Sequence, residues 1–230
     1  MNKSVRQFGR WLLTIGFIAL SNAGFAQDFE DEEDDQEIYA ERFRNAQGIA
    51  GSIGLTTTSF IVSGSYVRLF NPDWIGFAAF SMTSGRDPKE AEKIVGYGIS
   101  VVSVVYDSET GAEKKNSLLI MPITLGIQRR LFREDITSSF RPFVEAGVGP
   151  TVGYVYSYSG GFFGGGYLKL GFNGFVGAGA YFGSNPLSLQ GLTIRYHVDA
   201  FANGIELLPN RFRNAFHGVS LSLILGTFFL

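Results

Sequence analysis

The sequence predicts an all-β fold, a transmembrane, up-and-down, antiparallel β-barrel. Three observations support this fold class. Apolar residues alternate with small or polar ones from residue 47 onward, the chain holds 30 glycines and 22 phenylalanines, and its last strand stays apolar up to the C-terminus. In that strand every second residue from Val219 to Phe229 is apolar or nearly so. A strand with one such face fits a barrel wall that faces lipid.

Residues 1–26 are expected to be a cleaved signal peptide. Lys3, Arg6 and Arg10 make a positive start, residues 11–20 form an apolar core, and small residues precede the expected cleavage site. The apolar core is shorter than the roughly 20 residues that a membrane-spanning helix needs, which argues against a transmembrane anchor. We therefore expect an exported chain.

Residues 27–46 are expected to form an acidic, disordered periplasmic segment. Nine acidic residues crowd into residues 28–41, and like charges without apolar neighbours do not collapse. The alternative is a tail that binds divalent cations or a basic partner, or that folds back toward the barrel mouth. Residues 43–230 carry 15 basic and 12 acidic groups, which is no basis for a nucleic-acid partner.

The chain contains no cysteine. This excludes disulfides, thiolate metal sites and a cysteine nucleophile. The expected metal and cofactor content is none.

Eight strands are expected in a barrel of residues 47–230. One face of the last five strands is apolar and free of charge, and we expect it to meet lipid, whereas a soluble sandwich would bury it in a core. The faces of 60–70 and 74–84 are ambiguous, and residues 85–116, 157–166 and 205–215 are expected as outer loops. The expected strands are 47–57, 60–70, 74–84, 117–132, 140–156, 167–183, 191–204 and 216–230.

Residues 97–107 are as strand-like as any of these but do not fit a count of eight. We assign them to the long excursion 85–116, where the turn 107–111 would pair them with the start of the next strand. Ten strands are the alternative if residues 85–96 hold another strand.

With this pattern the chain resembles the small outer-membrane β-barrel proteins of Gram-negative-type bacteria, the outer-membrane protein A and X type of barrel domain. The resemblance is carried by the leader, the alternating strands, the segments MPITLGIQRRLF (121–132) and FRPFVEAGVGPTVG (140–153), and the aromatic last strand. It implies an outer-membrane location, contact with outer-membrane lipid, folding by the barrel-assembly machinery, and outer loops that meet an unknown ligand. Such barrels usually end in Phe, whereas here Leu230 follows Phe229.

A set of polar residues is expected to point into the lumen. The interior of an eight-stranded barrel is just wide enough for side chains, so we expect a filled network of salt bridges and hydrogen bonds. Basic residues outnumber Glu145 and Asp199, which leaves a narrow, anion-preferring path as an alternative. The candidate lumen residues are Arg68, Arg130, Arg141, Glu145, Lys169, Arg195, His197 and Asp199.

His197 and Asp199 share one face of a strand. Outer-membrane lipid A deacylases combine a strand-borne histidine with a serine two residues on, but that position is Asp199 here, so the nucleophile is missing. We expect no catalytic residues and a structural or surface-interaction role through the outer loops. A narrow pore for small solutes or anions and a lipid-modifying enzyme are the alternatives.

Overall fold

The computed structural model describes residues 46–57, 59–97, 100–132, 139–183, 185 and 187–229. The expected signal peptide and all of the expected acidic segment except Ala46 lie outside these residues. Among the described residues, no helix is long and apolar enough to cross a membrane.

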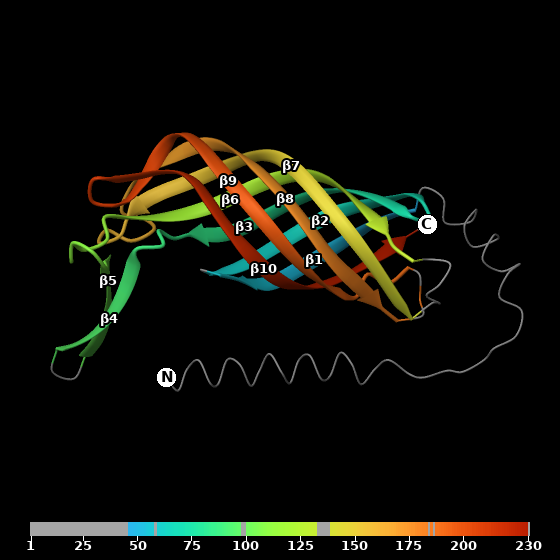
Figure 1. Ribbon diagram of the computed structural model, residues 1–230, viewed down its shortest axis with the longest axis horizontal. Coiled ribbons are helices and arrows are strands. Elements are labelled where there is room, and N and C mark those ends of the chain that lie inside the picture. Colours follow the sequence, from blue (N-terminus) through green and yellow to red (C-terminus); the bar gives the residue numbers. More distant parts are fainter. Residues whose placement is uncertain are drawn as a thin grey trace, which may run out of the picture. The chain divides into compact units, whose positions relative to one another are not determined.

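Within the described residues eight antiparallel strands close into a barrel (Figure 1), as the sequence predicts. Sequence neighbours pair side by side, and the first strand closes the barrel against the last, with Gln47 opposite Phe229. The connections 72–73, 131–139 and 183–190 and both ends of the barrel sequence lie at one end, here called the turn end. The connections 57–59, 86–115, 158–165 and 209–210 lie at the opposite end, here called the loop end. The barrel strands are β1 (Gln47–Thr56), β2 (Phe60–Asn71), β3 (Trp74–Gly85), β6 (Asn116–Arg130), β7 (Phe140–Ser157), β8 (Gly166–Phe182), β9 (Gly191–Leu208) and β10 (Arg211–Phe229).

The outer face of the barrel is apolar. Large side chains that point outward are widely exposed, for example Leu125, 65% exposed, and Leu170, 77% exposed. So much exposed apolar surface is unfavourable in water and fits the hydrocarbon of a bilayer. Near the turn end the tilted rings of Phe140 and Phe182 lie 5.8 Å apart, as in the aromatic girdle of membrane barrels. The outer face is therefore a lipid-facing surface.

Strands β9 and β10 run further than expected. Residues 205–208 and 211–213, which lie in the predicted outer loop 205–215, are paired with each other, and Ala215 pairs with Ala200. Only residues 209 and 210 form the turn. Two register shifts in β10 and the positive φ of Gly204 (58°) interrupt the alternation, so the pattern does not reveal these strand ends. The Lys115 N–H donates to the Leu207 carbonyl at 3.0 Å, which places the end of β9 against the start of β6.

The excursion between β3 and β6 forms a separate two-stranded sheet of β4 (Glu90–Tyr97) and β5 (Ser100–Asp107), which leaves the barrel at its loop end (Figure 1). Its place outside the barrel is as predicted. The predicted pairing of 97–107 with the start of the next barrel strand is wrong, apart from one bridge between Tyr106 and Glu113. Residues 90–97 offer a nearer partner, because a tight hairpin needs no long loop.

Candidate functional site

The lumen is filled by three layers of side chains. Apolar clusters lie at both ends, and a polar layer lies between them. Inward glycines make room for the rings: a Cβ on Gly126 would lie 2.2 Å from the Phe77 ring. The turn-side cluster contains Ala46, Val67, Phe143, Tyr181, Leu189, Ile224 and Phe228, and the loop-side cluster contains Leu118, Ile120, Val155, Phe201, Ile205, Leu207 and Phe216.

An ion pair between Glu145 of β7 and Arg195 of β9 forms the centre of the polar layer. Arg195 donates two hydrogen bonds to the carboxylate, from Nε at 2.7 Å and from Nη2 at 3.0 Å, and Thr193 Oγ1 donates a third. The strand between them presents Gly177, where a Cβ would lie 3.2 Å from the Glu145 carboxylate and 2.9 Å from Arg195 Cγ. The glycine therefore allows the two side chains to meet across β8.

A cavity of about 30 Å³ adjoins this pair. Since one water occupies roughly 10–15 Å³ on this measure, the cavity has room for about two water molecules. Its walls contain Ser52, Ser63, Ser65, Gln128, Glu145, Tyr181 and Arg195, together with smaller or apolar residues.

Asp199 is bound differently from the expected charge pairing. Its carboxylate accepts a hydrogen bond from Asn173 Nδ2 at 3.0 Å, and Asn173 Oδ1 accepts one from Thr124 Oγ1 at 3.1 Å. In the described part of the chain its partner is thus an amide and not a cation. His197 shares the inward row, as expected, and is half-buried. These two neighbours, whose side chains are both described, form no hydrogen bond with each other.

The other predicted lumen cations lie toward the two ends. Arg141 donates to the Ser188 carbonyl at 2.6 Å and lies over the Tyr181 ring, at the turn end. Arg130 is half-buried on the inward row of β6 near the same end. Lys169 is half-buried near the loop end, with its ammonium 5.9 Å from the centre of the Tyr167 ring. Lys169 thus lies at the end of the lumen opposite to Arg130 and Arg141.

Arg68 does not point into the lumen, so its assignment as a lumen residue is wrong. Its neighbours Val67 and Leu69 point inward and pack in the turn-side cluster, which leaves Arg68 exposed on the outer face beside Tyr66 and Phe70. Both rows of β2 contain apolar residues, so alternation alone cannot orient it. An outward arginine near the strand end reaches the polar interface with its long side chain.

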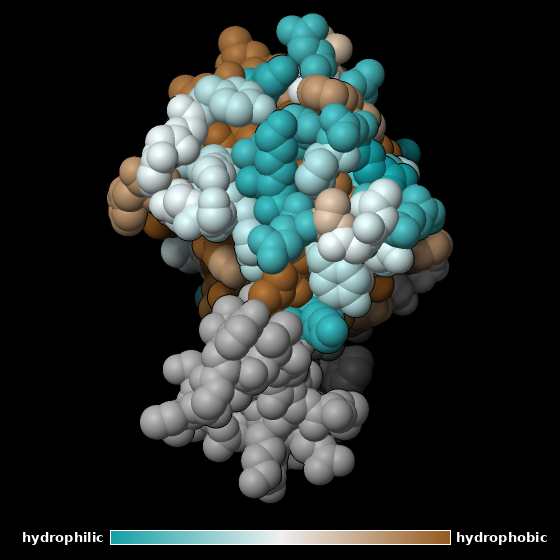
Figure 2. Space-filling view, turned by 90° about the vertical axis from the view of Figure 1, so that its left-hand side faces the viewer, coloured by the Kyte–Doolittle hydropathy of each residue, from teal (hydrophilic) through white to brown (hydrophobic). Residues whose placement is uncertain are grey.

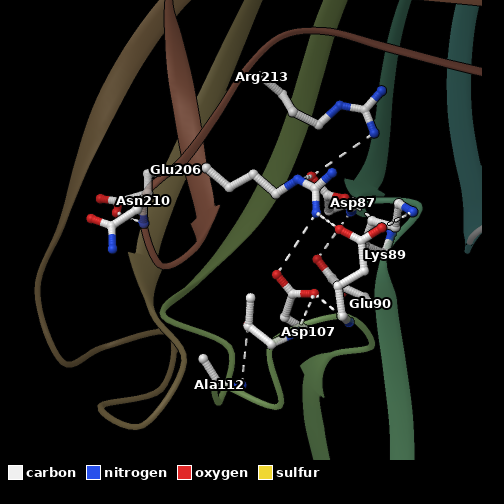
Figure 3. Close-up of polar contacts among 11 residues, drawn as sticks. Asp87, Lys89, Glu90, Asp107, Ala112, Glu206, Asn210 and Arg213 are labelled. Atoms are coloured by element: carbon white, nitrogen blue, oxygen red, sulfur yellow. Dashed lines mark hydrogen bonds and ion pairs between the residues drawn. The ribbon is translucent and has the colours of Figure 1, made fainter.

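A second group of polar residues, here called the mouth cluster, joins the base of the β4–β5 hairpin to the start of β10 (Figure 3). Arg211 Nη1 lies 3.4 Å from Glu109 and 3.7 Å from Asp107, and Arg213 Nη1 lies 3.9 Å from Asp87. The sequence analysis missed this cluster, because its partners are about 100 residues apart in the chain. The mouth cluster contains Asp87, Lys89, Glu90, Asp107, Glu109, Lys114, Lys115, Glu206, Arg211 and Arg213.

Two further ion pairs complete the mouth cluster. Lys114 Nζ lies 2.8 Å from Glu90 Oε2 and both side chains are buried, while Lys115 Nζ lies 2.5 Å from Glu206 Oε2. The hydrogen bond from Lys115 lowers the pKa of Glu206 below its usual value.

Two carboxyls in the hairpin base have lowered pKa values. A hydrogen bond from the backbone N–H of Glu109 lowers the pKa of Asp107, and the charge of Arg211 adds to this effect. A hydrogen bond from Lys89 lowers the pKa of Glu109. The mouth cluster therefore favours ionised carboxylates.

Among the described residues no group of three or more His, Cys, Asp or Glu side chains could hold a metal ion. The expected lack of a cofactor remains a prediction.

Comparison with known proteins returned structural similarities only. No protein-family model and no curated protein sequence matches the chain. Neisserial surface protein A is 12% identical, covers 80% of this chain and 95% of its own, and has a TM-score of 0.49. Ail, the attachment invasion locus protein of Yersinia pestis, is 14% identical over 80% and 95% of the two chains, with a TM-score of 0.38.

A third similar structure is the N-terminal β-barrel domain of Pseudomonas aeruginosa OprF, 12% identical over 80% and 98% of the two chains, with a TM-score of 0.37. These likenesses concern the fold alone. The closed ring of eight antiparallel strands and its apolar outer face are seen directly in this chain. The chain therefore has the fold of the small eight-stranded outer-membrane β-barrels that its sequence resembles.

Proposed function

We propose that this chain is a non-conducting outer-membrane barrel that holds the β4–β5 hairpin at the cell surface for interaction with another molecule. The observation that carries the proposal is a contrast between the lumen and the hairpin. The lumen is filled by two apolar clusters and an ion-paired layer, whereas the hairpin stands outside the barrel sheet.

The mouth cluster supports a display role for the hairpin. A two-stranded ribbon is marginally stable alone, so its order depends on what holds its base. Arg211 contacts three acidic residues of the hairpin base, and Lys114 pairs with Glu90 at the start of β4. These contacts would give the hairpin a defined position, which lowers the entropic cost of binding a partner.

The charge of the hairpin region limits the kind of partner. Residues 86–115 contain five basic and six acidic residues, and the mouth cluster joins many of them in pairs. Such a surface has no strong single-sign field to attract a highly charged polymer. We expect a partner that is bound through the hairpin backbone and its neutral side chains.

The alternatives have less support. A pore would need a path past both apolar clusters, and the cavity beside Glu145 has room for only about two waters. A lipid-modifying enzyme would need its histidine at the lipid, but His197 lies on the inward row. His217 does face outward, with the ring of Tyr196 at 6.3 Å as its aromatic neighbour. The residues two positions before and after His217 are Ala215 and Val219, which carry no nucleophile, so we propose no enzymatic activity.

The proposal is tested by trimming the hairpin. The Ser108 N–H donates to the Lys89 carbonyl at 2.9 Å, so a Gly-Gly turn can join these two residues in place of 90–107. Cells expressing the full or the trimmed chain are compared for adhesion to beads coated with gelatin, heparin or polylysine. We expect cells with the full chain to adhere to gelatin rather than to the charged polymers heparin and polylysine. Trimming the hairpin should abolish this adhesion.

Two controls accompany this experiment. Both chains should shift on gels when heated, as closed barrels do, and both should give no unitary currents in planar bilayers. Lys93→Ala, an exposed change on β4, serves as the matched surface variant and should keep adhesion. Steady currents, or equal adhesion of full and trimmed chains to every coat, would contradict the proposal.

A further inference from the structure

The connection between β7 and β8 differs from the other long loop in having no charge. Residues 146–168, which contain the loop 158–165, hold no Asp, Glu, Lys or Arg. Its tip reads GGFFGGG. Gly161 (φ 69°) and Gly165 (φ 93°) adopt the left-handed conformation on either side of Phe162 and Phe163, which allows the chain to reverse twice in a few residues.

This loop folds back on the outer face of β7. The ring of Phe162 meets Tyr154 at 5.2 Å and Tyr156 at 5.4 Å, both edge to face, and the Tyr154 hydroxyl donates to the Phe162 carbonyl at 3.0 Å. Tyr154 and Tyr156 belong to the outward row of β7. The ring of Phe163 lies 5.2 Å from Phe162. We call Tyr154, Tyr156, Phe162 and Phe163 the loop aromatic cluster.

Phe163 is 96% exposed, the largest exposure among the large apolar side chains of the described residues. The loop aromatic cluster is continuous with the lipid-facing surface, because Tyr154 lies opposite Leu168 and Val152 lies opposite Leu170. Leu168 and Leu170 are themselves widely exposed on the outer face. The apolar wall of β7 and β8 thus continues into the loop without an intervening charge.

We propose that the loop 158–165 is a membrane anchor, and that Phe162 and Phe163 insert into the outer leaflet at the boundary of headgroups and acyl chains. A fully exposed phenylalanine is unfavourable in water, and aromatic rings concentrate at this boundary, where tyrosine hydroxyls still reach polar groups. The two phenylalanine rings are therefore surrounded by lipid and not by a protein partner. This role goes beyond the proposed function, which concerns the β4–β5 hairpin.

The test uses the two tryptophans of the sequence, Trp11 and Trp74, both changed to Phe in the full chain. Phe163→Trp in this background places one indole on the loop, and Thr110→Trp places one on the exposed turn 108–110 at the hairpin base as the matched control. Phe162→Trp is a second loop variant. Each folded protein is placed in phosphatidylcholine vesicles with and without lipid brominated near the top of the acyl chains.

Brominated lipid is expected to quench the indole at position 163 several-fold more than the indole at 110, and aqueous iodide should show the opposite order. Strong iodide quenching at 163 without lipid quenching would overturn the anchor. Protection from both quenchers would mean that a second copy or another protein covers the ring, which also overturns it. A lipid-quenched indole at 110 would instead contradict the display of the hairpin, so the two proposals fail separately.

Discussion

Two loops at the same end of this barrel have opposite chemistry. Residues 86–115 carry five basic and six acidic residues and are held by ion pairs, whereas residues 158–165 carry no charge and are held by ring contacts. The first loop is tied to the start of β10 through Arg211, and the second is folded on the outward row of β7. Each loop has the chemistry of the surface against which it lies.

The comparison shows that the rim of a small membrane barrel borders two different environments. Figure 2 views the loop end and shows hydrophilic residues gathered over its middle and hydrophobic residues toward its sides. Ion pairs stabilise the middle of the loop end, where charged groups contact water and neighbouring strands. Aromatic rings are useful at the sides, where the lipid begins. The two loops should therefore respond differently to charge removal, acid and ring removal.

The largest difference is expected on removing a buried cation from the hairpin base. Lys114→Ala leaves Glu90 buried, with Arg86 at 3.7 Å as its remaining ion-pair partner. Removing one partner of a buried ion pair costs about 3 kcal/mol at the lower end of measured values, enough to open the hairpin locally. Thermolysin should then cut residues 90–107 roughly 100-fold faster while the barrel still shifts on heating.

Lys93→Ala is the control for this change, because the Lys93 side chain is exposed. It should alter cleavage by less than about twofold. Equal cleavage in Lys114→Ala and Lys93→Ala would show that the hairpin base does not depend on its buried ion pair. The loop 158–165 should keep its cleavage rate in both variants.

Acid should loosen the hairpin and leave the aromatic loop in place. The pKa values of Asp107, Glu109 and Glu206 are lowered in the folded chain, so their stabilising effect is complete above their ordinary pKa values. It is lost as the pH falls through the lower folded values, that is, below about pH 4. The loop 158–165 has no acidic group to protonate.

Fluorescence anisotropy measures this contrast, because the chain has no cysteine and accepts single labels. A dye on Thr110→Cys should lose anisotropy as the pH falls below about 4, and a dye on Ser159→Cys should not, in line with the carboxyl range. A matching loss at both sites would mean that acid affects the barrel as a whole. No loss at position 110 would mean that the carboxylates do not hold the hairpin.

The strands that form these surfaces were largely predictable, since alternation alone assigns the faces of β6, β7, β8 and β10. Leu125, Val148 and Leu221 are exposed as predicted, and Glu145 is buried as predicted. Arg68 was placed wrongly because both rows of β2 mix apolar residues with small ones. The ends of β9 and β10 were missed because bulges break the period of two.

Side-chain partners were less predictable than strand faces. The inward position of Asp199 follows from alternation, but its partner Asn173 follows only from the register of β8 with β9. The mouth cluster depends on the way the β9–β10 hairpin approaches residue 115, which no local pattern describes. Charge runs at 86–93 and 107–115 were the available signal, but they do not identify Arg211 as the partner.

A smaller effect is expected on removing a ring from the loop aromatic cluster. Phe162→Ala deletes three edge-to-face contacts, with Tyr154, Tyr156 and Phe163, each worth about 0.5–1.5 kcal/mol. A spin label on Ser159→Cys should then become more mobile in detergent, where no leaflet holds the loop. Phe163→Ala is the matched control, because Phe163 contacts only Phe162 within the cluster and should leave the label unchanged. If the spin label is equally mobile in both variants, contacts other than those of Phe162 hold the loop in place.

The smallest effect is expected at Arg211, although it reaches three carboxylates. Its contacts with Asp87, Asp107 and Glu109 are 3.4–3.9 Å long and its side chain is about one-third exposed, so water and salt screen them. Arg211→Gln should raise thermolysin cleavage of the hairpin less than about threefold at 0.15 M salt, and more at low salt. A rise in cleavage as large as that in Lys114→Ala, unchanged by salt, would mean that the long contacts of Arg211 and not the buried pair hold the hairpin. The mouth cluster would then act as a single cooperative unit.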